Sequence, residues 1–306
     1  MAELFYNAMK YTKKALNIDE IIDSLERDGL LVPNRRSAKK FLSNVGYFRF
    51  ASYLNFFRDR LSPDFRYKHG VSFEQVRRLY DFDSKLRDLI FSAIQKIEVA
   101  LRSRIIHQFS LSDGPFWFCD ISCATNQYNF SENLSIIERE LKRSKEDFIK
   151  EHLNVYGDTE FPPAWKTLEL ASFGCITKLY YNYNRTSEKK IIARGFGVTK
   201  TDALDSWIKV INVLRNNCAH HTRIWNRKYL VQPQIPAELP HKWLNNTAFD
   251  SRRTYAILCC MAYLLNSIDS HNSFKKSLKS LIKKYPLDSV SYMGFPSDWA
   301  NEPLWR

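Results

Sequence analysis

The spacing of the apolar residues constrains the fold of this chain most. Apolar side chains recur at steps of three and four residues through most of the 306 residues, and only nine residues are glycine. This is the period of an amphipathic helix, and no segment shows the alternation of a strand. The sequence therefore predicts an all-α protein, with helices at 17–28, 36–60 (broken near Gly46), 73–110, 127–152, 164–183, 200–217, 247–268 and 273–284.

One loop stands out as a domain boundary. The segment from Ser62 to Gly70 contains turn-forming residues and precedes the long helical pattern that begins at Phe73. We predict a small N-terminal helical unit at residues 1–70 and a larger helical body at 71–306. The apolar content of 44% is ample for packed cores.

Several classes of protein are disfavoured by the composition. Apolar stretches such as Tyr255 to Leu265 fall short of the roughly 20 residues that cross a bilayer. The N-terminus lacks the charged-then-apolar pattern of a signal segment. The six cysteines have no paired metal-ligand spacing, which favours reduced thiols over disulfides or a zinc site. We expect a cytoplasmic protein with no membrane partner, no metal and no cofactor.

The net charge of +13 favours a polyanionic partner such as RNA, because Lys and Arg contact phosphates and release counterions. Basic and aromatic residues are interleaved in the N-terminal unit, a pattern that suits stacking and phosphate contacts. The alternative is that Phe50, Tyr53 and Phe57 belong to the core and that the charge serves solubility. The predicted RNA-facing basic residues are Arg35, Arg36, Lys39, Lys40 and Arg49.

A charged residue lies on the apolar face of the helix predicted at 200–217. Arg215 follows Leu204 by eleven residues, which places it about 20° from that leucine around the helix axis. Burying an unpaired charge costs several kcal/mol, so Arg215 needs an internal acid, a second subunit or a bound phosphate. The segment continues as Arg215-Asn216-Asn217-Cys218-Ala219-His220-His221, an arginine, a polar residue, three residues and a histidine.

The helix predicted at 73–110 offers acids that could pair with Arg215. Asp83 lies on its apolar face, four residues before Arg87, and Glu98 lies four residues before Arg102. Either acid could neutralise Arg215, or each could simply pair with the arginine on its own helix. The R-x4-H spacing recurs here from Arg102 to His107, where we interpret the histidine as structural or solvent-facing.

Taken in order, a set of short segments resembles the Abi-like proteins, the AbiD/AbiF group of bacterial abortive-infection factors. These segments are Leu25…Gly29-Leu30, Gly46-Tyr47-Phe48-Arg49…Tyr53, Leu79-Tyr80-Asp81-Phe82-Asp83…Leu86-Arg87, Ile97-Glu98…Arg102-Ser103, Pro163-Ala164-Trp165, Glu169, Ser172-Phe173-Gly174 and Arg215-Asn216-Asn217-Cys218-Ala219-His220.

The resemblance implies a fold and an activity. It implies a helical bundle of the HEPN type and a ribonuclease centre with an R-polar-x3-H motif, often assembled across a dimer. Carried over, Arg215, Asn216 and His220 are the catalytic residues. From their helical positions, and not from the resemblance, we expect Asp83, Glu98 and Arg102 to support them, together with His221. His221 departs from the motif and leaves the proton-transfer group open between two histidines. The family also implies defence against phage and, in some members, a small structured RNA partner.

The residue types suit metal-independent RNA cleavage. A histidine can transfer protons near neutral pH, an arginine can bind the non-bridging phosphate oxygens, and Asn216 could orient His220 or contact phosphate. Residues five apart on a helix point about 140° apart, however. Either the helix ends near Cys218 and turns, or the motifs of two subunits face each other in a homodimer, which is the arrangement we expect.

Two other functions compete with an endoribonuclease toxin. The first is a non-catalytic RNA-binding protein of a defence ribonucleoprotein, in which Arg215 and His220 are structural. The second is nucleotidyl transfer, which is disfavoured because the sequence has no glycine-rich phosphate loop and no acidic metal-binding pair in a strand context.

Overall fold

The computed structural model describes residues 12, 14–157, 160–285 and 290–306. These residues form helices, short 3₁₀ turns and loops, with isolated β-bridges but no strand, which confirms the all-α prediction. The chain divides into two compact units, Met1–Phe82 and Asp83–Arg306, within the long helix α4 (Phe73–Asp113). The predicted domain limits, 1–70 and 71–306, fall in the loop before this helix and stay a prediction.

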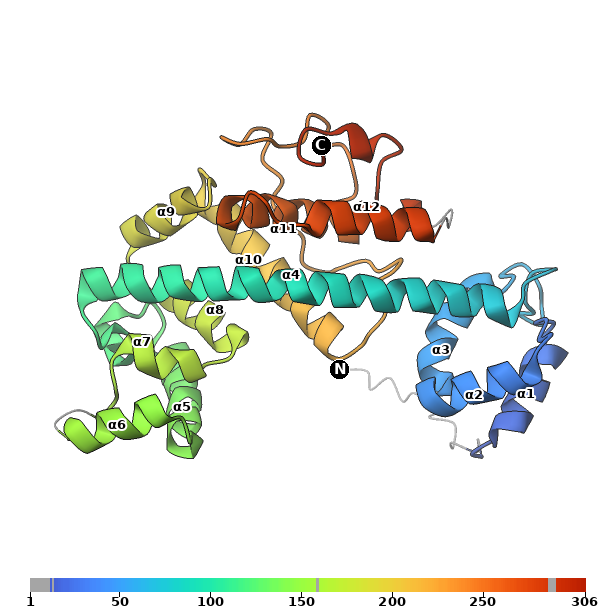
Figure 1. The fold of residues 1–306 in the computed structure, drawn as a ribbon, viewed down its shortest axis with the longest axis horizontal. Coiled ribbons are helices and arrows are strands. Elements are labelled where there is room, and N and C mark those ends of the chain that lie inside the picture. Colours follow the sequence, from blue (N-terminus) through green and yellow to red (C-terminus); the bar gives the residue numbers. More distant parts are fainter. Residues whose placement is uncertain (1–11, 13, 158–159, 286–289) are drawn as a thin grey trace, which may run out of the picture. The chain divides into compact units, whose positions relative to one another are not determined.

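The first unit contains α1 (Ile18–Arg27), α2 (Arg35–Val45) and α3 (Tyr47–Leu54), coloured blue in Figure 1. Gly46 has a φ of +81°, which side-chain-bearing residues rarely adopt, and it breaks the predicted 36–60 helix where expected. Phe50 and Tyr53 are buried, so the core alternative holds for both. Their rings pack edge-on against Tyr80 of α4.

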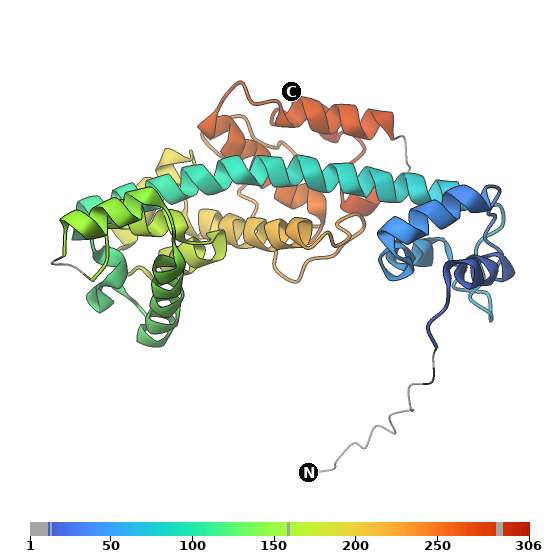
Figure 2. The same ribbon diagram turned by 60° about the horizontal axis from the view of Figure 1, so that its bottom comes forward.

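The second unit continues α4 from Asp83 and adds helices on two sides of it (Figures 1 and 2). The helix α10 packs against α8, α9 and α11 and also contacts α4 through Arg215, so it lies at the centre of this unit. The helices are α5 (Gln127–Arg143), α6 (Asp147–Val155), α7 (Ala164–Thr167), α8 (Phe173–Asn182), α9 (Thr186–Gly195), α10 (Thr201–Ala219), α11 (Thr254–Ile268) and α12 (Phe274–Lys284).

The most buried helix is α11, in which every residue from Thr254 to Leu265 is buried. Its apolar residues therefore form part of the core of the second unit. In the part of the chain that the structure describes, no helix has both the length and the apolar character needed to cross a membrane.

Local side-chain hydrogen bonds explain where the helices differ from prediction. The predicted 164–183 helix is interrupted because Ser172 caps α8 by accepting from the Cys175 amide. The predicted start at 247 is wrong, since the Asn246 and Asp250 side chains accept from the amides of Ala248 and Arg252 and hold a turn. The predicted 127–152 helix is interrupted between α5 and α6, and α9 was not predicted.

All six cysteines are free thiols, and burial suppresses their ionisation. Desolvation raises the pKa of Cys175 to about 11, and it raises the pKa of Cys218, inside the arginine–histidine segment, to about 12. A thiolate is the nucleophile in alkylation, so these buried thiols are chemically inert at neutral pH.

Iodoacetamide is therefore expected to label Cys175 and Cys218 of the native protein roughly 100-fold or more slowly than a free thiol near neutral pH, because each unit of pKa is tenfold in thiolate. Mass spectrometry of the labelled peptides measures the rates. Labelling should speed up as the pH rises, and both thiols should react fully in denaturant. Equally fast labelling with and without denaturant would contradict burial of these residues.

Candidate functional site

The arginine–histidine segment lies at the C-terminal end of α10. The helix is amphipathic: Leu204, Trp207, Ile208, Ile211 and Leu214 are buried on its inner face. Arg215 follows directly on that face and is half-buried, with 32% of its side chain exposed. The sequence argument placed Arg215 on the apolar stripe, and the structure finds it at the border of that stripe with solvent.

Two residues of α4 contact the Arg215 guanidinium. Its Nε lies 3.9 Å from the Glu98 Oε2, and its Cζ lies 5.9 Å from the centre of the Phe91 ring. The Nε is buried and forms no hydrogen bond within the described residues. This long ion pair and the ring contact orient the guanidinium, and they leave its terminal nitrogens available to an anionic ligand.

Glu98 is shared between two arginines. Its Oε1 accepts a hydrogen bond from the Arg102 Nη2 at 3.2 Å, while its Oε2 faces Arg215. Arg102 also donates to the carbonyls of Glu169 and Ala171 at 3.0 and 2.9 Å. Both pairings considered for Glu98 in the sequence are therefore present together, and Arg102 additionally ties α4 to the segment before α8.

The helix ends directly beside the histidines. His220 is the C-terminal cap of α10, and its amide donates to the Asn216 carbonyl. The chain reverses at His221, which has a φ of 54°, while the amides of His221 and Thr222 donate to the carbonyls of Cys218 and Asn217. This is the usual C-terminal hydrogen-bond pattern, in which glycine normally takes the position of His221.

The side chains of Asn216, His220 and His221 are exposed, whereas Arg215 faces α4. Because the reversal follows His220 rather than preceding it, the helical separation of about 140° between Arg215 and His220 persists. The helix ends one residue after Cys218 and then turns, and whether Arg215 and His220 act within one chain or across a dimer stays a prediction.

Residue 221 has a left-handed backbone, and the free-energy cost of placing a side chain in that conformation can be measured. His221→Gly is expected to leave the protein about 1 kcal/mol more stable than His221→Ala, because both remove the imidazole but only glycine adopts this φ without a steric penalty. Urea unfolding of the two variants measures the difference. Equal stabilities would mean that the backbone at this position is not held in the left-handed region.

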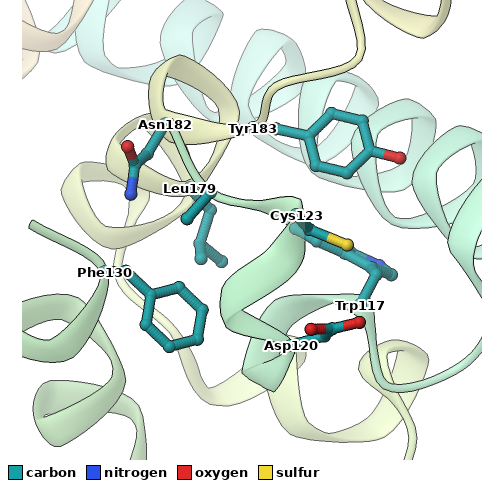
Figure 3. Close-up of a pocket in the computed structure, with 8 residues that line it drawn as sticks. Trp117, Asp120, Cys123, Phe130, Leu179, Asn182 and Tyr183 are labelled. Atoms are coloured by element: carbon teal, nitrogen blue, oxygen red, sulfur yellow. The ribbon is translucent and has the colours of Figure 1, made fainter. Parts of the chain in front are cut away.

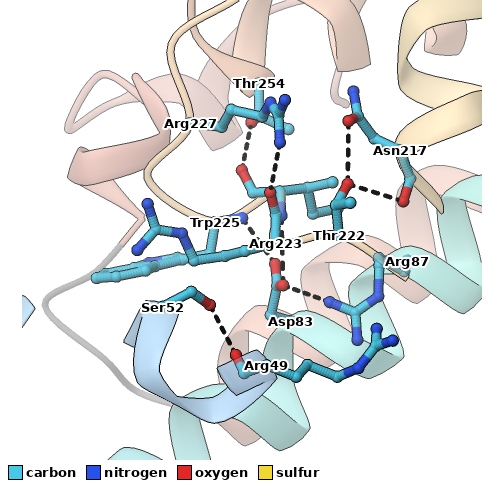
Figure 4. A network of polar contacts seen from close by, with 11 residues as sticks. Arg49, Ser52, Asp83, Arg87, Asn217, Thr222, Arg223, Trp225, Arg227 and Thr254 are labelled. Carbon is cyan, nitrogen blue, oxygen red and sulfur yellow. Dashed lines mark hydrogen bonds and ion pairs between the residues drawn. The ribbon is translucent and has the colours of Figure 1, made fainter. Parts of the chain in front are cut away.

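Asp83 anchors the loop that follows the histidines (Figure 4). This residue is fully buried and pairs with Arg87 on its own helix. Its carboxylate also accepts hydrogen bonds from the amides of Ile224 and Trp225, at 3.3 and 2.7 Å. The ion pair of Arg215 is with Glu98, and Asp83 instead fixes the backbone after His221.

In the first unit, the basic residues predicted to face RNA divide into two groups. Arg35 pairs with Asp23 and Glu26, and Lys39 pairs with Asp19, so these two residues hold α2 to α1. Arg36, Lys40 and Arg49 are exposed. No described acid forms an ion pair with Arg36 or Lys40, and these two are the better candidates for phosphate contact. The predicted RNA contacts themselves stay a prediction.

The cavities of the second unit differ greatly in size. The one in Figure 3, between Trp117, Cys123 and Tyr183, has a volume of about 10 Å³, at most the space of one water molecule. Two others reach about 410 and 420 Å³, large enough for a small ligand. One lies beside Asn126 and Lys178, and the other beside His107 and Trp165.

A family model described as Abi-like protein matches residues 40–226, more than half of the chain. The chain belongs to the Abi-like protein family. The matched region includes the Arg215–His220 segment of this Abi-like protein as well as Asp83, Glu98 and Arg102. Comparisons with curated proteins and with solved structures found no match.

Phe91 is the contact that sequence reasoning missed in this Abi-like protein. It lies four residues after Arg87 and seven before Glu98, and therefore on the same face of α4. A helical projection could have placed it beside Glu98, but only the packing of α10 shows that it contacts Arg215. His107 is exposed, consistent with the solvent-facing interpretation. Among the described residues, no group of three or more His, Cys, Asp or Glu could hold a metal ion.

Proposed function

We propose that this protein is a cytoplasmic, metal-independent endoribonuclease toxin of a bacterial abortive-infection system, with a HEPN-type catalytic centre. Membership of the Abi-like family supports the defence role. The observation that carries the proposed activity is the Arg215 guanidinium, oriented by Glu98 and Phe91 and still open to an anion, five residues before the exposed His220.

In the proposed reaction, Arg215 binds the non-bridging oxygens of the scissile phosphate and stabilises the charge of the transition state. A neutral histidine, His220 or His221, takes the proton of the 2′-hydroxyl, and the freed oxygen attacks the adjacent phosphorus. A second, protonated histidine donates a proton to the 5′-oxygen as that oxygen leaves. The products are a 2′,3′-cyclic phosphate and a 5′-hydroxyl. Asn216 contacts phosphate or orients His220.

The separation of Arg215 and His220 around α10 favours a site shared between two copies of the chain. In a two-fold symmetric dimer, Arg215 of one copy can meet His220 of the other, and the symmetry generates two equal sites. Arg36 and Lys40 then contribute phosphate contacts outside the site, and a small structured RNA partner could restrain the toxin there.

The principal test separates toxicity from RNA binding. Arg215→Ala and His220→Ala variants are expressed in bacteria, growth is followed, and co-purifying RNA is sequenced for its ends. The nuclease is supported when both variants lose growth arrest but retain bound RNA, and when the wild-type ends carry 2′,3′-cyclic phosphates. Growth arrest that survives both substitutions would refute it.

A non-catalytic RNA-binding protein remains the second candidate, favoured by Phe48, which is 92% exposed next to Arg49 in the first unit. An exposed aromatic beside a cation suits base stacking. This candidate predicts that Arg215→Ala and His220→Ala leave the cellular RNA uncut and the phenotype unchanged, while Phe48→Ala weakens RNA binding.

A further inference from the structure

The pocket of about 420 Å³ in the second unit lies between α4 and the short helical segment that contains α7. Ser103, His107 and Ser110 form one wall, at helical positions that share a face of α4, and Trp165 and Glu169 line the other side. The proposed cleavage mechanism uses none of these side chains. The volume falls within the range of small-molecule sites.

Trp165 is the outlier among the seven tryptophans. It is 52% exposed, whereas the other six are at most 8% exposed. An exposed indole at the wall of a pocket is the group on which an unpaired base can stack, because every base presents a π-face.

The three polar side chains that α4 contributes to the pocket form no hydrogen bond with other described residues. Ser103 and His107 are exposed and form no hydrogen bond within the described residues, and the Ser110 hydroxyl also lacks a partner there. The other large pocket differs, because Asn126 and Asn182 bond to each other's backbone or side chain, and Lys178 pairs with Glu132. The pocket at Trp165 therefore offers the freer hydrogen-bonding groups.

Arg102 connects a residue of this pocket, Glu169, to Glu98, the ion-pair partner of Arg215. Its Nη1 lies 3.6 Å from the Glu169 Oε2 and donates to the Glu169 carbonyl, while its Nη2 bonds to Glu98, the partner of Arg215. Along α4, Ser103 and His107 lie about 8 and 14 Å beyond Glu98 at 1.5 Å per residue. At 100° per residue these two side chains also lie about 140° and 180° around the axis from Glu98, so a strand whose phosphate contacts Arg215 has to pass around α4 to place a base in this pocket.

We propose that this pocket binds an unpaired RNA base, which stacks on Trp165 and donates a hydrogen bond from its exocyclic amino group to Glu169. A carboxylate accepts from an amino group, so cytosine, adenine and guanine are favoured over uracil, which has none. The inference rests on the proposed function in taking the bound base to belong to the RNA that Arg215 contacts. The pocket then selects a base of the same RNA away from the cleaved bond.

The test measures base binding without cleavage, using His220→Ala protein and the mononucleotides CMP, AMP, GMP and UMP. Tryptophan fluorescence is expected to be quenched to saturation by the first three, with UMP binding at least several-fold more weakly. The quench should disappear in Trp165→Phe, which removes the reporter and keeps a stacking ring. By calorimetry, Trp165→Ala should weaken CMP binding about tenfold or more.

Two further variants sharpen the result. Glu169→Gln replaces an acceptor by a group that both donates and accepts, and it should narrow the gap between CMP and UMP. Tyr128→Ala removes an aromatic ring that is 76% exposed on α5, outside this pocket, and should change neither affinity.

Absence of saturable quenching, an equal quench in Trp165→Phe, or equal CMP and UMP affinities would overturn the proposal. A dimer that dissociates in Trp165→Ala with unchanged nucleotide affinity would assign the pocket to contact between copies instead, and would also overturn it. Nucleotide binding is measured in a His220→Ala background, so it can be interpreted even if the protein proves not to be a ribonuclease. Conversely, a lack of nucleotide binding would not decide whether the protein cleaves RNA.

Discussion

His220→Ala is expected to lower the rate of RNA cleavage about 10²- to 10⁴-fold, the usual contribution of a positioned general acid or base. Because His220 is exposed at the end of α10, the substitution removes no core contact, and the unfolding temperature should stay close to that of the wild type. Single-turnover cleavage of a labelled RNA measures the rate. His221→Ala is measured in parallel, and the histidine variant with the larger loss of cleavage identifies the proton-transfer group.

Arg215 permits a sharper version of this experiment. Arg215→Ala should abolish cleavage, and Arg215→Lys should restore little of it, because an ammonium cannot make the two parallel contacts of a guanidinium with phosphate. RNA binding should persist in both variants if the rest of the surface supplies affinity. Loss of binding and cleavage in equal measure would instead make Arg215 a binding residue.

Mixing two inactive variants tests whether the site spans two chains. In a dimer of one Arg215→Ala chain and one His220→Ala chain, a composite arrangement leaves one intact site, since the unaltered Arg215 and His220 then meet. With random exchange, half of the dimers are mixed, so about a quarter of the wild-type activity should return. No recovery from demonstrably mixed dimers, or full activity in a strictly monomeric form, would refute the composite site.

Asp83→Ala is expected to destabilise the second unit by about 3–5 kcal/mol, because it leaves the buried Arg87 without its carboxylate and removes the acceptor for two amides. For a unit of this size, that corresponds to a fall in the unfolding temperature of roughly 6–20 °C. Thermal unfolding followed by circular dichroism measures it.

The control is Glu138→Ala, which breaks a surface pair with Lys142 at the same i, i+4 spacing and should cost no more than about 0.5 kcal/mol. A double variant, Asp83→Leu with Arg87→Met, should recover part of the loss, because it removes both buried charges together. Equal effects of Asp83→Ala and Glu138→Ala would show that the Asp83 network does not stabilise the fold.

The elements that could be predicted from sequence are those whose signal is local. Apolar periodicity placed α4, α10 and α12 within a few residues, and Gly46 marked the break between α2 and α3. The burial of Asp83 and Arg87 also followed from their place on the apolar face of α4. By contrast, α9 buries only Ile192 and Ala193, too little apolar surface to stand out from a polar loop.

Contacts between distant segments could not be predicted in this way. The sequence suggested Glu98 as a partner for Arg215, but it gave no means of choosing between Glu98 and Asp83, since that choice depends on how α10 crosses α4. It also could not show that Arg35 and Lys39 are paired with acids of α1. The catalytic roles of Arg215, Asn216 and His220 stay a prediction.

The anchoring of Ile224 and Trp225 by Asp83 has a consequence for the entropy of substrate binding. The histidine segment is held at one end by the last turn of α10 and at the other by two amide bonds to a buried carboxylate, so few backbone torsions between them remain to be fixed. A preorganised loop loses little conformational freedom when RNA binds. Hydrogen exchange at the amides of Ile224 and Trp225 should accordingly be slow before RNA is added and change little afterwards.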